Sequence, residues 1–238
     1  MESSLVEISL TGDQMLTVLE CVARDGPVSA AEVARNCDIN RTVAHRLLTT
    51  LAQRAYIRRE IAGYVLGPAL LQLTRGMNTD LPSKAKPIMQ KLAAQTGETV
   101  VLHGIANSEA VVIEQALGQK HLVRVEHRPG SRHSLLQGAS GWSLIAFQDM
   151  KHIERVLKSS PDPQAARNRI ALTREQGYAI SYDELQLGVH GIAVPIMERD
   201  GRCDASLAIL VPAARSDLLH SLLKPLLNAA HEISRLVA

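Results

Sequence analysis

Apolar residues recur every three or four positions near the start of the chain and predict a first helix. Its buried face comprises Met15, Leu16, Leu19, Val22 and Ala23. The preceding residues, Thr11 to Gln14, have the form of a capping box with Thr11 as the N-cap residue. Asp25-Gly-Pro27 ends the helix, because glycine accepts a left-handed cap and proline cannot continue the hydrogen-bond ladder.

Two further helices are expected, separated by a tight turn. Ser29 to Glu32 is a second capping box and opens a helix that ends near Asn36. Asn40 is a good N-cap residue for the third helix, which runs to about Gln53. This third helix has a polar, cationic face beside an apolar face of Val43, Leu47, Leu48 and Leu51. Such a helix suits a DNA major groove.

The next stretch predicts a hairpin and then a connection. Tyr56 to Leu66 consists of two extended runs on either side of Glu60 to Gly63, which is typical of two strands and a turn. Three helices followed by a hairpin predict a winged helix-turn-helix domain over residues 1–66. Leu66 to Arg75 reads as a short connecting helix and Met77 to Pro82 as a polar linker, so residues 67–82 form the connection.

The rest of the chain, residues 83–238, changes character and predicts an α+β domain with a mostly antiparallel sheet, because strands are bracketed by helices. The expected helices are Ser83–Gln95, Ser140–Phe147, Asp162–Gln176 and Ser216–Leu236. The expected strands are Thr99–Ile105, Ala110–Ala116, His121–Val125, Ala179–Tyr182, Gly191–Met197 and Asp204–Val211.

The distribution of charge along the chain indicates where a partner could bind. The net charge of +2 indicates no partner by itself. From Ile39 to Arg59, however, the chain carries five arginines and no acid. Such a window is expected where a protein contacts phosphates, and the alternative is a solvated helix face.

The candidate DNA-binding residues lie on the third helix and on the hairpin. Arg41, Thr42 and His45 are expected to read base edges, and Arg46, Thr49, Arg58 and Arg59 to contact phosphates. Ser29 and Asn40 complete the set. They lie at helix N-termini, whose free backbone N–H groups attract phosphate.

Catalytic motifs are missing from the sequence. Gly138-Ala-Ser-Gly141 lacks the G-x-S-x-G spacing of a nucleophile elbow, and His152-Ile-Glu154 lacks the downstream P-C-x-x-C of a zinc deaminase. The three cysteines are too far apart for a ligand set. We therefore expect no catalytic residue, metal or cofactor. Without a signal peptide or an apolar run long enough for a membrane span, we expect a cytoplasmic protein that does not bind membranes.

A small-molecule site is a better candidate. Trp142 lies beside Gly138 to Gly141, where free amides at a helix N-terminus would meet an anion. The alternative is that Trp142 is a core residue.

Several segments together resemble the IclR family of bacterial transcription regulators. They are Asp13–Leu16, Val28–Ala34, Arg41–Leu51, Tyr64–Gly67, Thr96–Leu102, Gly141–Ala146 and Gly177–Pro195. The resemblance spans residues 11–236 in the right order.

This resemblance implies a winged-helix DNA-binding domain, a linker helix and a GAF-like effector-binding domain. It also implies homodimers through the DNA-binding domains and often tetramers, as dimers of dimers, through the effector domains. The family's pocket positions carry over to Leu122, Val125, His133, Ala139, Ser140, Ser181, Val189, Gly191, Ala208 and Leu210, with Trp142 beside them.

Some positions depart from the family's pattern. Trp142 replaces a common lysine, Ser181 a frequent acid, and Ala208 and Leu210 frequent hydroxyl residues. This pocket is therefore less polar, and it favours a larger, apolar or aromatic ligand over a small keto acid, with Ser140 holding the polar end. The helix-turn-helix also has Asn36-Cys37-Asp38 where a glycine is expected in the turn.

Two functions remain open at this point. The first is an effector-responsive regulator, a repressor rather than an activator, that binds a palindromic double-stranded DNA operator. The second is an enzyme that converts a small molecule and carries an N-terminal interaction module.

Overall fold

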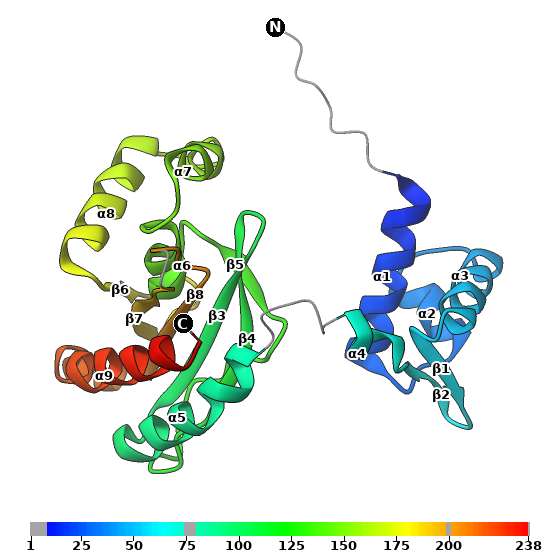
Figure 1. The fold of residues 1–238 in the computed structure, drawn as a ribbon, viewed down its shortest axis with the longest axis horizontal. Coiled ribbons are helices and arrows are strands. Elements are labelled where there is room, and N and C mark those ends of the chain that lie inside the picture. Colours follow the sequence, from blue (N-terminus) through cyan, green and yellow to red (C-terminus); the bar gives the residue numbers. More distant parts are fainter. Residues whose placement is uncertain (1–8, 74–79, 199–200, 238) are drawn as a thin grey trace, which may run out of the picture. The chain divides into compact units, whose positions relative to one another are not determined.

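The computed structural model describes residues 9–73, 80–198 and 201–237. The chain divides into two compact units between residues 79 and 80. Each unit has its own hydrophobic core, and each is described by itself (Figure 1).

The first unit is a winged helix-turn-helix, as predicted. Its helices are α1 (Leu10–Asp25), α2 (Ala30–Asn36), α3 (Arg41–Gln53) and α4 (Ala69–Leu73), and its antiparallel hairpin pairs β1 (Ile57–Glu60) with β2 (Gly63–Leu66). Val18, Val33, Leu48 and Ile57 meet in its core. The periodicity identified the buried face of α3, but it was only partly right for α1, where Leu16 and Ala23 are exposed and Val18 and Cys21 are buried instead.

Side-chain caps fix where these helices begin. The capping box of Ser29 and Glu32 is present, and Asn40 accepts the Thr42 amide at 2.8 Å. The predicted box at Thr11 is wrong, because Ser9 caps α1 and accepts from the Gly12 amide, so the helix begins before Thr11. In the turn before α3, Asp38 has a φ of 49°. Aspartate tolerates this left-handed conformation, so the missing glycine does not prevent the turn.

The second unit is built on a six-stranded sheet in the order β5-β4-β3-β8-β7-β6, with every described pair antiparallel. The strands are β3 (Thr99–Ala106), β4 (Glu109–Ala116), β5 (Arg132–Ser134), β6 (Ala179–Tyr182), β7 (Val189–Ile196) and β8 (Ala205–Pro212). The predicted α+β class is confirmed.

Helices cover both faces of this sheet (Figure 1). On one face lie α5 (Asp80–Thr96) and α9 (Leu219–Val237), the latter preceded by the 3-10 helix η2 (Ala213–Leu218). On the other lie α6 (Gly138–Ile145), α7 (Met150–Leu157) and α8 (Pro163–Gln176). Side chains alternate between the two cores, so Leu102 packs toward α5 and α9 while Val101 packs toward α6.

Three predictions for this unit need correction. The predicted strand His121–Val125 is absent, because the Val123 and Val125 carbonyls accept hydrogen bonds from the side chains of Arg215 and Thr99 instead of from a strand. β5 and α7 were not predicted. The predicted linker Met77–Pro82 ends earlier than expected, because α5 already includes Pro82. Residues 77–79 of this linker lie outside the described part of the chain.

Within the described ranges, no helix has the length and apolar character to cross a membrane.

Candidate functional sites

The polar face of α3 is open to solvent. All five residues predicted to contact DNA from this helix are exposed, namely Arg41, Thr42, His45, Arg46 and Thr49. The opposite face buries Ala44, Leu47, Leu48 and Leu51 in the core of the unit. The core therefore fixes the helix and leaves its cationic face uncovered within this unit.

A groove of about 220 Å³ lies between this helix and the wing. Ser29, His45 and Arg59 line it, although they come from the start of α2, from α3 and from β1. The wing is held there by two backbone hydrogen bonds between Val28 and Tyr64, of 3.1 and 2.8 Å. The fold thus brings three of the predicted residues to one groove.

The wing separates the two arginines that the sequence treated alike. Arg58 pairs with Val65 and Arg59 with Tyr64 across the hairpin, so neighbouring side chains point to opposite faces. Arg59 lines the groove, whereas Arg58 forms an exposed ion pair with Glu60 at 2.8 Å. Ile61, in the turn of the wing, also lines the groove, is fully exposed, and was not predicted.

Most of the predicted effector positions lie on the α6 face of the sheet. A β-carbon added at Gly191 would lie 3.1 Å from Leu210 Cδ2, 3.5 Å from Ser181 Oγ and 3.7 Å from Ala139 Cβ. Four predicted residues from β6, β7, β8 and α6 therefore converge there. His133 on β5 contacts Ser140 on α6, with 3.2 Å between Nε2 and Oγ. Val125, Val189 and Ala208 belong to the same core cluster.

Leu122 does not join this group. It is fully exposed and lines an outer groove of about 470 Å³ together with Lys120, His121 and Arg124. The segment therefore separates its two predicted effector positions, since Val125 is buried on the α6 face and Leu122 is not.

Trp142 belongs to a polar network as well as to the core. Its Nε1 donates to Glu184 at 2.8 Å, and the Gly138 amide donates to the same carboxylate at 2.9 Å. Arg169 donates to the other oxygen of Glu184 at 2.8 Å, and its guanidinium lies 5.2 Å from the centre of the Trp142 ring. The expectation of a free amide here is wrong at Gly138, because the chain's own carboxylate occupies it.

Two histidines that the sequence did not single out lie beside His133. The ring centres are 5.4 Å apart for His103 and His133, 6.2 Å for His103 and His127, and 6.5 Å for His127 and His133. Strand alternation was the available signal, since it places His103 on the same face as Val101. Within the described ranges, no three His, Cys, Asp or Glu side chains are placed to hold a metal ion.

The hydrogen bonds of His133 define its tautomer. Its Nδ1 lies 3.0 Å from the Ser134 carbonyl, which only accepts, so Nδ1 carries the proton. Nε2 therefore accepts from the Ser140 hydroxyl. Burial lowers the pKa of His103, His127 and His133 below the ordinary value, so the cluster is uncharged at neutral pH.

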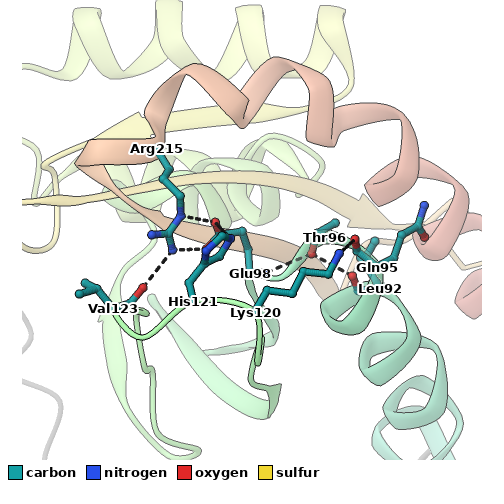
Figure 2. Close-up of polar contacts among 8 residues, drawn as sticks. All are labelled: Leu92, Gln95, Thr96, Glu98, Lys120, His121, Val123 and Arg215. Atoms are coloured by element: carbon teal, nitrogen blue, oxygen red, sulfur yellow. Dashed lines mark hydrogen bonds and ion pairs between the residues drawn. The ribbon is translucent and has the colours of Figure 1, made fainter.

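A buried ion pair holds the connection between β4 and β5, residues 117–131, against the end of α5. Arg215 donates to both oxygens of the fully buried Glu98, at 2.5 and 2.9 Å, and to the Val123 carbonyl at 3.0 Å (Figure 2). Lys120 donates to the Gln95 carbonyl at 2.7 Å. Two side-chain contacts thus fix the start of the connection.

Comparisons with known proteins give one consistent result. The model of the IclR helix-turn-helix domain matches residues 13–60, and that of the bacterial transcriptional regulator IclR C-terminal domain matches residues 76–235. The chain is 27% identical to the HTH-type transcriptional regulator BhcR of Paracoccus denitrificans, covering 93% of this chain and 85% of that one. It is 24% identical to the transcriptional repressor IclR of Escherichia coli, covering 83% and 81%.

Solved structures show the same fold. An IclR transcriptional regulator from Alicyclobacillus acidocaldarius superposes with a TM-score of 0.79 at 24% identity, covering 98% of this chain and 100% of that one. An IclR homologue from Microbacterium hydrocarbonoxydans, solved in complex with 4-hydroxybenzoate, gives 0.80 at 24% identity, covering 94% and 98%. The chain belongs to the IclR family of DNA-binding transcriptional regulators, which are not enzymes.

Proposed function

We propose that the protein is a repressor that binds a palindromic operator as a dimer or a dimer of dimers and responds to a small-molecule effector. Residues 1–66 bind DNA, residues 67–79 connect, and the second unit, which begins with α5, binds the effector. The observation that carries this proposal is the groove in which Ser29, His45 and Arg59 meet beside the exposed face of α3. Its place of action is the cytoplasm.

The residues of the DNA-binding unit divide into two roles. Arg41, Thr42 and His45 are the ones that read base edges, because they lie on the first turns of α3, the part of a recognition helix that contacts bases. Phosphate contacts come from the remaining residues, Ser29, Asn40, Arg46, Thr49, Arg58 and Arg59.

Affinity arguments favour an oligomer. Non-specific binding by one module lies in the range of about 10⁻⁴–10⁻⁶ M at physiological salt. A regulator needs several kcal/mol more binding free energy at its operator than this. Two linked modules on a palindrome supply it, because the second binding event is then intramolecular.

The effector is an apolar or aromatic molecule that binds on the α6 face. The residues are Val125, His133, Ala139, Ser140, Trp142, Ser181, Val189, Gly191, Ala208 and Leu210. Two observations support this class: the apolar side chains at positions 208 and 210, and the aromatic ligand of the Microbacterium homologue. Leu122 is left out of the set because it is exposed on another groove.

The test of the DNA-binding role is a gel-shift titration of the full-length protein at several salt concentrations. The probes are the DNA upstream of its own gene and random DNA of equal length. We expect tighter binding to the upstream DNA and a steep loss of affinity with salt. Binding that depends on neither salt nor sequence would falsify the proposal.

The effector site has its own test. Ser140→Trp places a large side chain against His133, so we expect it to abolish the response to effector while operator binding stays intact. The screen uses thermal shifts with aromatic acids, hydrazides and keto acids. Stabilisation by keto acids alone would contradict the argument from Ala208 and Leu210.

A further inference from the structure

A group of buried polar atoms on the α6 face has no hydrogen-bond partner among the described residues. These atoms are both ring nitrogens of His103, Nδ1 of His127 and Oγ of Ser206. His103 and Ser206 are both fully buried and are directly paired across β3 and β8, so their side chains point to the same face. Native proteins pair nearly all such groups, and an unpaired set at one place indicates a missing partner.

The segments that carry His127 and His133 are held by contacts that leave these atoms free. The His127 backbone donates to Gln115 Oε1 at 3.2 Å, and Thr99 Oγ1 donates to the Val125 carbonyl at 2.6 Å. The start of the same connection is fixed by Arg215, as Figure 2 shows. His133 is fixed separately, by Ser134 and Ser140. The histidine cluster is therefore preorganised rather than held together by its own hydrogen bonds.

Within the described ranges, no arginine or lysine side chain bonds to the unpaired atoms of His103, His127 and Ser206. The neighbouring arginines are engaged with carboxylates: Arg132 lies 3.6 Å from Glu109, Arg124 lies 3.2 Å from Glu126, and Arg169 lies 2.8 Å from Glu184. Arg128, in the same connection as His127, is exposed. Burial also opposes protonation of the imidazoles, since it lowers the pKa of each. An anion bound here would lose its hydration without gaining a counter-charge.

Neutral imidazoles instead suit an uncharged partner. Each neutral ring has one donor and one acceptor nitrogen, and the serine hydroxyl both donates and accepts. We propose that His103, His127 and Ser206 bind the polar end of an uncharged effector that carries a donor and an acceptor side by side, such as an aromatic amide, in preference to the matching carboxylate. This inference rests on the proposed function and adds the chemical class of the effector.

Matched pairs of probes test the class. The binding of benzamide and benzoate, and of 4-hydroxybenzamide and 4-hydroxybenzoate, is measured with the full-length protein by calorimetry and thermal shift at neutral pH. We expect each amide to bind at least about ten-fold more tightly than its acid, a difference of about 1.4 kcal/mol. Acids that bind as tightly as the amides overturn the proposal. So does a protein that none of the four compounds stabilises, or that only Ni²⁺ or Zn²⁺ stabilises.

A substitution tests the residues. His103→Leu puts an apolar side chain of similar size in place of the imidazole and so removes both unpaired nitrogens. We expect amide binding to weaken at least about ten-fold. The melting temperature of the ligand-free protein should stay or rise, because an unpaired polar group is no longer buried. His127→Leu, on the connection rather than in a strand, is the second variant in case the first does not fold. His231→Leu, at an exposed position of α9, is the matched control and should change neither quantity.

The two proposals fail in different ways. If the His103→Leu variant binds amides as the parent does, the site is wrong. If the parent binds operator DNA in a salt-dependent way but shows no preference for amides, only the effector class fails. If it binds amides but no DNA, only the proposed regulatory function fails.

Discussion

Arg41 and Arg58 carry the same charge but lie in different surroundings. Arg41 is the first residue of α3 and is exposed, whereas Arg58 on the wing pairs with Glu60 at 2.8 Å. We expect Arg41→Ala to lower operator affinity by about 1–3 kcal/mol and to relax specificity at one base pair. We expect Arg58→Ala to weaken operator and random DNA alike and to reduce the salt slope by about one. Fluorescence anisotropy with both DNAs over a range of salt measures these effects.

The wing offers a control for this comparison. Glu60→Gln releases Arg58 without removing it, so phosphate binding should hold or improve on both DNAs. Equal losses on operator and random DNA for Arg41→Ala would instead assign that arginine to phosphate.

Trp142 shows what residue types alone cannot decide. The sequence allowed either a core residue or a residue beside a free helix N-terminus. Glu184, which lies 42 residues further along the chain, bonds to both Trp142 and the Gly138 amide. A contact at this separation depends on how β6 and α6 pack together, and no local pattern records it. The grouping of His103 and His127 with His133 was missed for a related reason, since strand alternation gives the face of His103 but not the packing of residues 117–131 and β5 beside it.

At the scale of elements, prediction succeeded for most segments that satisfy their own backbone, with the capping box at Thr11 as the exception because Ser9 caps α1. The capping box at Ser29 and the amphipathic pattern of α3 are local, and both are confirmed. The segment His121–Val125 was predicted as a strand, but its Val123 and Val125 carbonyls bond to the side chains of Arg215 and Thr99. These two side chains belong to other elements, so the sequence of the segment alone cannot show that its carbonyls bond to them rather than to a neighbouring strand.

The ion pair between Arg215 and Glu98 makes a contribution to the free energy of unfolding that can be measured. Its partner Glu98 has a side chain that is 1% exposed. Arg215→Ala would leave that carboxylate buried with only the His121 ring, 3.7 Å away, beside it, so we expect the free energy of unfolding to fall by about 3–5 kcal/mol. Urea-induced unfolding measures the change.

The double variant Arg215→Ala with Glu98→Gln should recover much of this loss, because no charge is then left buried. Arg167→Ala is the matched control, since its ion pair with Glu154 is solvent-exposed on both sides. A large loss in that control as well would show that the effect is not specific to the buried pair.

At the scale of the whole molecule, the histidine cluster predicts a stability that depends on pH. Burial holds the pKa of His103 well below its usual 6.5, and those of His127 and His133 are lowered too. Below pH 6.5 the unfolded chain therefore binds more protons than the folded one, and the free energy of unfolding falls as the pH drops. Above that pH the three histidines contribute no slope.

Urea unfolding of the full-length protein at a series of pH values checks this. His103→Leu should reduce the slope between pH 6.5 and about pH 5.5, whereas Glu154 and Asp183, whose pKa values are also lowered, act mainly below about pH 5. An unchanged slope in the variant would mean that His103 takes up its proton in the folded state.

Effector and operator binding are linked through the whole molecule and must affect each other equally. If the effector lowers the operator affinity by some factor, thermodynamic linkage requires that the operator lower the effector affinity by the same factor, typically about 5–150-fold for a coupling of 1–3 kcal/mol. The check is to measure operator affinity with and without saturating effector, and effector affinity with and without saturating operator. We expect equal factors for the parent protein and a factor of one for Ser140→Trp, which keeps operator binding and loses the effector. Unequal factors in the parent would mean that the two measurements do not report the same states, and that effector binding on the α6 face is not what releases the operator.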